Sequence, residues 1–242
     1  PLLFFLPTEI IGPETTSADL LNAIPSNLRL FLILISFVAV VPGIWLVVKK
    51  LHDLPLMSIL SSRKKLDFNR IIFSFILWGI IVTSIITSGF LISPENFELN
   101  FKLKEFLVLI IIAIILVPIQ TSVEEVVFRG YLMQGFGNWF NSRIMALILS
   151  CTVFGLLHII NPEITKLGYG FIFVYLVGSF AMGITVLMDD GLELALGFHA
   201  ANNLILMLLY TSDWSVIQTE AILKDISDPT YGVLDIFIGV LI

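Results

Sequence analysis

The sequence predicts an all-α protein, a polytopic transmembrane bundle of about seven helices. Only 13% of its 242 residues are charged, whereas a soluble domain carries about 25%, and 57% are hydrophobic. Apolar runs of about 20 residues, the length that crosses a bilayer core, recur along the chain. The chain begins at Pro1 without a Met and stops at Ile242 within an apolar run, so we expect it to be truncated at both ends.

The first 105 residues are predicted to form a surface segment and a helical hairpin. Residues 1–27 combine short apolar patches with three prolines, which is typical of a segment at the membrane surface. Residues 28–105 form a hairpin of two spans joined by a basic cytoplasmic loop. The expected parts of the hairpin are the span Leu28–Val48, the basic loop Lys49–Arg70, the span Ile71–Ile92 and the polar loop Ser93–Glu105.

Residues 106–210 are predicted to form a helical core of four spans. Residues 211–242 follow as a polar loop and the start of a last span. Small residues in the third span of the core, among them Gly178, Ser179 and Gly183, favour close helix contact. The expected core spans are Phe106–Met133, Ile144–Ile160, Gly168–Met188 and Leu192–Tyr210.

The distribution of Lys and Arg predicts the orientation. If the N-terminus lies outside, the cytoplasmic loops contain seven basic residues and the segments on the other side of the membrane contain five. We therefore expect a multi-pass protein, located in the cytoplasmic membrane if the source is bacterial, with Trp139 and Phe140 as anchors among the membrane lipids. The net charge of −6 and the lack of a Lys/Arg-rich block argue against a nucleic-acid partner.

Three ionisable residues stand at the end of the apolar run 106–119. An ionised side chain at a helix centre costs about 2.5–3.5 kcal/mol on insertion scales, so Glu124, Glu125 and Arg129 need a reason to be there. In a helix, Glu125 and Arg129 share one face and can form an ion pair. Glu124 points about 100° away, which leaves it free for chemistry.

Two of the three histidines lie within predicted spans and are candidate partners for Glu124. His158 ends one span, and His199 shares a helical face with Asn203, four residues further on. A carboxylate and a neutral imidazole can hold a water, with Glu124 as general base, while His199 and Asn203 can donate hydrogen bonds to an oxyanion. Alternatively, Glu124, His158 and His199 are three ligands of a catalytic Zn²⁺ with an open water position.

Other polar residues have structural explanations. Cys151 lies inside an apolar run, where a small buried residue is common. Its distance of about 10 Å along the helix from His158 is too long for a catalytic pair. Asp189 and Asp190 are expected to be solvated loop charges, and Asn202 to make a helix–helix hydrogen bond. The sequence has neither a His-Glu-x-x-His motif nor a Gly-x-Ser-x-Gly elbow.

Together, the polar patterns resemble the three motifs of the CPBP family. This family groups the type II CAAX prenyl endopeptidases with bacteriocin-processing and self-immunity (Abi) membrane proteins. The resemblance covers residues 106–210. The matching patterns are Glu-Glu-x-x-x-Arg at Glu124, Glu125 and Arg129, Phe-x-x-x-His at Phe154 and His158, and His-x-x-x-Asn at His199 and Asn203.

The resemblance implies an all-helical intramembrane protease. By motif position, Glu124 activates a water with His158, the Glu125–Arg129 pair supports them, and His199 with Asn203 stabilises the oxyanion. The family has been described as both glutamate proteases and metalloproteases, so the zinc alternative stays open. The expected partner is a peptide or protein substrate, with or without a lipid modification.

Two other functions fit the same residues. A non-hydrolytic immunity or scaffold protein would keep the motifs as a structural polar network. A proton- or ion-coupled transporter would also use a buried Glu and His, but it predicts broken helices and repeat-related segments, which the sequence does not show.

Overall fold

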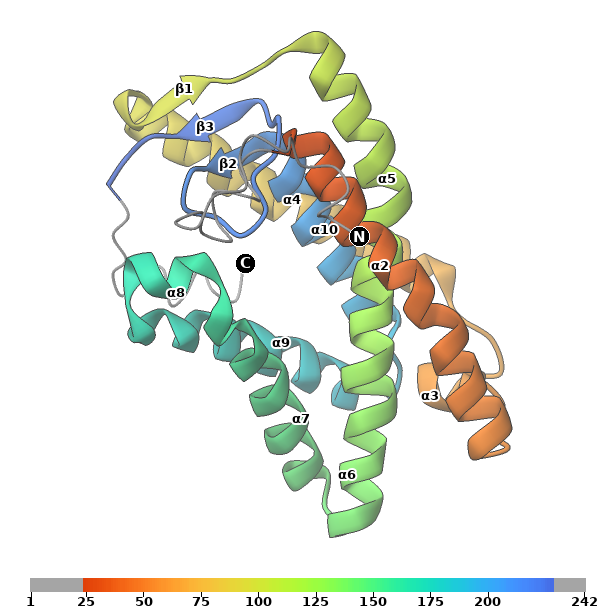
Figure 1. The fold of residues 1–242 in the computed structure, drawn as a ribbon. Coiled ribbons are helices and arrows are strands. Elements are labelled where there is room, and N and C mark those ends of the chain that lie inside the picture. Colours follow the sequence, from red (N-terminus) through yellow and green to blue (C-terminus); the bar gives the residue numbers. More distant parts are fainter. Residues whose placement is uncertain (1–23, 229–242) are drawn as a thin grey trace, which may run out of the picture.

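A computed structural model describes residues 24–228 and confirms the predicted all-α membrane bundle (Figure 1). Five helical stretches are long and apolar enough to cross a membrane. The sixth expected span is a shorter apolar helix, Glu193–Leu209. The predicted seventh span and most of the segment 1–27 lie outside the described residues. The five long stretches are Ser26–Leu51, Phe68–Ile92, Leu103–Phe140, Arg143–Ile160 and Tyr169–Asp189.

The chain alternates long helices with short connecting elements. Two π-helical stretches, Val47–Leu51 and Val126–Leu132, extend α2 and α5. Short 3₁₀ turns occupy Pro94–Asn96, His158–Ile160 and Tyr169–Phe171. The named elements are α2 (Ser26–Leu46), α3 (Met57–Leu60), α4 (Phe68–Ile92), β1 (Phe97–Leu99), α5 (Leu103–Glu125), α6 (Met133–Phe140), α7 (Arg143–Leu157), α8 (Pro162–Leu167), α9 (Ile172–Asp189), α10 (Glu193–Leu209), β2 (Tyr210–Ser212) and β3 (Leu223–Asp225).

A small sheet replaces part of the two loops predicted after the second and sixth spans. Its strand order is β1-β3-β2, with β1 antiparallel and β2 parallel to β3 (Figure 1). Each strand has only three residues, which is too short for an alternating apolar pattern in the sequence. The sheet ties the end of α4 to the segment that follows α10.

The long third span contains both a proline and a change of helix type. Pro118 lies inside α5 and has no backbone N–H to donate to the helix. Close to it, the hydroxyl of Thr121 donates to the carbonyl of Val117 at 3.0 Å. After Glu125 the helix widens into the π-helical stretch and then continues as α6 to Phe140, beyond the predicted end at Met133. π-Helical turns are rare and often occur at functional sites.

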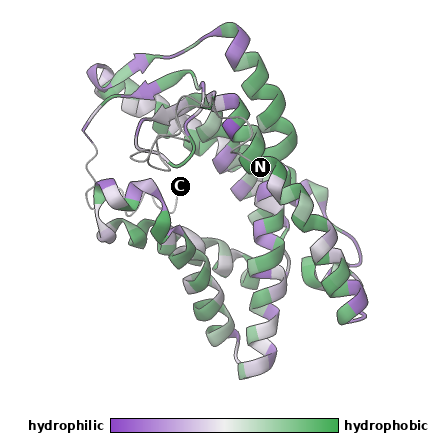
Figure 2. Cartoon of the chain, viewed as in Figure 1, coloured by the Kyte–Doolittle hydropathy of each residue, from purple (hydrophilic) through white to green (hydrophobic). Residues whose placement is uncertain are grey.

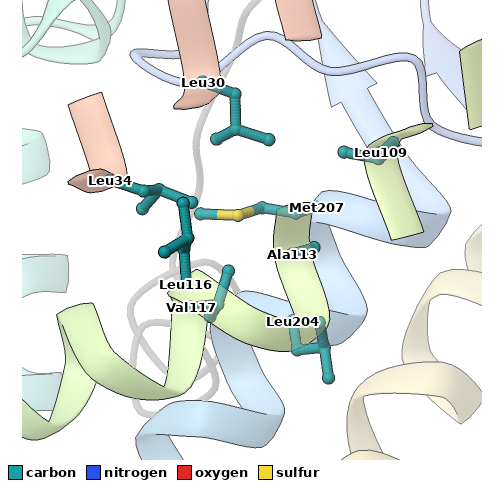
Figure 3. Packing of buried hydrophobic residues seen from close by; sticks show 8 residues of the cluster. All are labelled: Leu30, Leu34, Leu109, Ala113, Leu116, Val117, Leu204 and Met207. Carbon is teal, nitrogen blue, oxygen red and sulfur yellow. The ribbon is translucent and has the colours of Figure 1, made fainter. Parts of the chain in front are cut away.

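One half of the bundle consists of α2, α4, α5 and α10. α10 packs against both α4 and α5, and α2 packs against α5. Gly197 is required there, because an added Cβ would collide with the backbone of Ile71 and with Ser74 on α4. Figure 2 shows hydrophobic residues along most of α5 and α7, and hydrophilic residues in the sheet. The core of this half, drawn in Figure 3, contains Leu30, Leu34, Leu109, Ala113, Leu116, Val117, Leu204 and Met207.

α7 and α9 form a second, tightly packed pair. A Cβ at Gly183 would lie 2.5 Å from the sulfur of Cys151, so the helices approach at this glycine. The predicted close contact of the small-residue span is therefore confirmed. Cys151 is fully buried in this interface, as expected. In Figure 1 the pair diverges from α4 and α10 towards α8.

The basic loop is anchored to the α9–α10 turn by ion pairs. Arg63 contacts Asp189 at 3.0 Å and Glu193 at 3.1 Å, and Arg70 also pairs with Asp189. The expectation that Asp189 is a solvated charge is wrong, because only 7% of its side chain is exposed and the rest is buried. Glu193 is fully buried at the start of α10. This network fixes the end of the helix that carries His199.

Candidate active site

The centre of the site is an ion pair within one helical stretch. Glu125 ends α5, and Arg129 lies four residues on, in the π-helical stretch. Their side chains are fully buried and form the predicted pair, with 3.0 Å between Nη1 of Arg129 and Oε1 of Glu125. The second guanidinium nitrogen donates to the hydroxyl of Ser179 at 2.9 Å, and the guanidinium lies 4.1 Å from the ring centre of Phe154. Arg129 therefore connects α5, α7 and α9.

His199 joins the pair from α10. Its Nδ1 lies 2.7 Å from Oε1 of Glu125, the oxygen that also accepts from Arg129. A carboxylate can only accept, so Nδ1 carries the proton. In the neutral ring Nε2 then has a lone pair that can accept a hydrogen bond, and Glu125 fixes both the tautomer and the ring orientation.

Glu124 faces the other nitrogen of the same imidazole. Its Oε2 lies 3.7 Å from Nε2 of His199, which is longer than a hydrogen bond. The Glu124 side chain is 20% exposed, whereas that of Glu125 is completely buried. As predicted, Arg129 neutralises the carboxylate of Glu125, and the carboxylate of Glu124 has no arginine partner among the described residues and stays partly exposed.

Two side-chain amides complete this side of the site. Nδ2 of Asn203 lies 3.4 Å from Nε2 of His199 and 3.3 Å from Oε1 of Gln120. Gln120 is buried, and its side-chain amide lies beside the carboxylate of Glu124, one helical turn further along. Its spacing of four residues before Glu124 is a signal that could have identified it in the sequence.

His158 lies near this group, but the imidazole that faces Glu124 is that of His199. Nδ1 of His158 lies 3.0 Å from the carbonyl of Phe154, and the ring stacks on Tyr175 with 4.4 Å between centres. Phe154 contacts both imidazoles, with ring-centre distances of 4.9 Å to His158 and 6.4 Å to His199. The pairing of Glu124 with His158 stays a prediction.

Comparisons with known proteins agree with this geometry. Residues 103–205, which include every predicted site residue, match the family model described as type II CAAX prenyl endopeptidase Rce1-like. The chain is 32% identical over 218 residues to the uncharacterized protein YyaK of Bacillus subtilis strain 168, across 89% of this chain and 73% of that protein. The chain belongs to the Rce1-like family. No solved structure matches it.

Membership of the Rce1-like family makes this an integral membrane protein of peptidase type. The family match starts at Leu103, the first residue of α5, and ends within α10. It thus contains α5, which supplies Glu124 and Glu125, and the part of α10 that supplies His199 and Asn203. The hairpin before residue 103 contributes α4, against which α10 packs.

The residues do not form the zinc site that was considered as an alternative. In the part of the chain that the structure describes, no three His, Cys, Asp or Glu side chains gather closely enough to hold a metal ion. Glu124 and His199 face each other, but the ring of His158 contacts Phe154 and Tyr175.

Proposed function

We propose that the protein is an intramembrane endopeptidase that hydrolyses a peptide bond with a water activated by Glu124. The observation that carries this proposal is the 3.7 Å separation between Oε2 of Glu124 and Nε2 of His199. A water at about 2.8 Å from both atoms can bridge them. Donating one proton to each, the water would present its oxygen lone pair to a substrate carbonyl.

The reaction needs one proton to move twice. Glu124 takes a proton from the water as the oxygen attacks the carbonyl carbon, which gives a tetrahedral intermediate with a negative oxygen. When the water occupies the lone pair of His199 Nε2, the Nδ2 hydrogen of Asn203 that otherwise points to this nitrogen can be donated to the negative oxygen. Glu124 then gives its proton to the amide nitrogen, the C–N bond breaks, and a carboxylic acid and an amine leave.

The buried pair keeps the imidazole in the required state. Because Nδ1 of His199 donates to Glu125, Nε2 stays an acceptor for the water. Arg129 balances the charge of Glu125, so the two side chains together place no net charge inside the apolar bundle. We assign Glu125 and Arg129 as positioning residues for this reason.

The substrate that we propose is a peptide or protein segment that reaches the site within the membrane. Prenylated CAAX proteins and bacteriocin-like peptides are the two classes suggested by the family. The relative from Bacillus subtilis supports a bacterial cytoplasmic membrane as the location.

The test is cleavage of a panel of prenylated and unprenylated peptides by purified protein in detergent. Wild type and Glu124→Gln are compared, each with and without phenanthroline. We expect wild type to cleave with or without the chelator, and Glu124→Gln to fold but lose all cleavage, because an amide cannot take up the proton. Equal cleavage by the two proteins would refute the role of Glu124. Loss of cleavage with the chelator would instead favour a metal-dependent reaction.

A further inference from the structure

A chain of hydrogen bonds runs from α4 through α10 to the site. Nε1 of Trp78 lies 3.2 Å from Oδ1 of Asn202, which confirms the helix–helix hydrogen bond expected for this asparagine. Nδ2 of Asn202 lies 3.3 Å from Oδ1 of Asn203, and Nδ2 of Asn203 lies 3.3 Å from Oε1 of Gln120. Four side chains from three helices are thus connected in series.

The first member of the chain determines the direction of all the others. An indole N–H can donate but cannot accept, so the atom of Asn202 that faces Trp78 must be the carbonyl oxygen. The NH₂ group of Asn202 then points to Asn203 and requires an acceptor there. As a consequence, the NH₂ group of Asn203 points away from Asn202, towards Gln120 and Nε2 of His199.

We propose that Trp78 is a positioning residue that, through Asn202, holds the NH₂ group of Asn203 towards the reacting atoms. This inference rests on the proposed function, in which that NH₂ group donates to the oxyanion. A flipped Asn203 would present its oxygen to the lone pair of His199 Nε2 and to the negative oxygen of the intermediate. Both contacts are repulsive, so only one of the two amide orientations supports the reaction.

The direction of the chain continues to the catalytic carboxylate. Since Oε1 of Gln120 accepts from Asn203, the NH₂ group of Gln120 is left to face the neighbouring carboxylate of Glu124. The series begins at an indole N–H that only donates, so each amide along it has one preferred orientation.

Trp78 also has a packing role that a variant can preserve. Its ring lies against Phe198, with 3.8 Å between ring centres. Trp78→Phe keeps an aromatic ring at this position and removes the N–H. Trp45→Phe is the matched control, because Trp45 is exposed on α2. Thermal midpoints of both variants show whether each still folds.

The first measurement is the kinetics of peptide cleavage. We expect Trp78→Phe to lower kcat about three- to tenfold, the effect of one hydrogen bond, with KM unchanged and Trp45→Phe at wild-type level. Asn202→Leu should lower kcat at least as much. Because both changes break the same chain, the double variant should be no slower than Asn202→Leu alone. The proposal would be overturned if Trp78→Phe had the kcat of wild type. It would also be overturned if the reductions in kcat of the two single variants multiplied in the double variant.

The second measurement does not need activity. Dicyclohexylcarbodiimide modifies protonated carboxyl groups in apolar surroundings, and mass spectrometry locates the product. Once Asn203 can turn, Gln120 is no longer held with its NH₂ group towards Glu124, and Glu124 should be modified faster in Trp78→Phe and Asn202→Leu than in wild type or Trp45→Phe. Unchanged modification would contradict the chain of amides. If wild type cleaves no peptide, the proposed function fails, while the labelling rates still decide whether Trp78 controls the environment of Glu124.

Discussion

Replacing Arg129 by leucine tests how much the buried pair contributes to folding. The change removes the partner of Glu125 at 3.0 Å and the bond to Ser179 at 2.9 Å, in a place where neither partner of the ion pair touches solvent. Leaving a buried charge unpaired costs about 3–5 kcal/mol. His199, at 2.7 Å from Glu125, can still compensate in part, so we expect a loss near 3 kcal/mol.

The loss is measured as the free energy of unfolding in mixed detergent micelles, from circular dichroism during titration with dodecyl sulfate. The only cysteine, Cys151, is fully buried, so a thiol-reactive dye provides a second probe of unfolding. Lys102→Ala is the control, because the Lys102–Glu220 pair is 3.5 Å long, its lysine is 61% exposed, and such pairs contribute about 0–1 kcal/mol. Equal losses in the two variants would refute the reasoning. Adding Glu125→Gln to Arg129→Leu should restore part of the stability, since no unpaired charge is then buried.

Two further predictions concern parts of the fold outside the site. Burial raises the pKa of Glu163 on α8, although the amide of Val216 donates to it at 2.6 Å. A raised pKa means that the folded state loses stability as the pH rises from the ordinary range of a carboxyl group through the raised value. Glu163→Gln should therefore increase the thermal midpoint more at about pH 8 than at about pH 4, and an equal change at both would contradict this. Gly183→Ala places a Cβ 2.5 Å from the sulfur of Cys151 and should cost about 1–3 kcal/mol in the same micelle titration. Gly135→Ala, with no atom within 4 Å of the added Cβ, is the control, and equal unfolding free energies would show that α7 and α9 can separate without cost.

The parts of the site that depend on nearby residues could be predicted from the sequence. A spacing of four along a helix was enough to identify the Glu125–Arg129 pair and the shared face of His199 and Asn203, because helix geometry alone determines such contacts. The cost of charge in a membrane also predicts a functional role for these residues, and that role stays a prediction. The long spans were equally clear from apolar length.

The contacts that depend on packing between helices could not be predicted. The sequence gives no rotation of α7 relative to α5, so it could not decide whether His158 or His199 faces Glu124. The π-helical stretch has no sequence signal of its own. The indole of Trp78 resembles any other aromatic residue of an apolar span until α4 is packed on α10. The ion pairs of Asp189 with the basic loop were missed for the same reason, because they join residues more than one hundred positions apart.

The pairing of Glu125 with Arg129 also affects how the chain enters the membrane during synthesis. His199, the other partner of Glu125, is made 74 residues later, so α5 must first partition into lipid without it. Each unpaired charge at a helix centre would oppose that step by about 2.5–3.5 kcal/mol. The arginine is made only four residues after Glu125 and can neutralise it as soon as the helix forms. The same contact that orients the imidazole in the finished protein thus helps α5 to enter the lipid before the rest of the site exists.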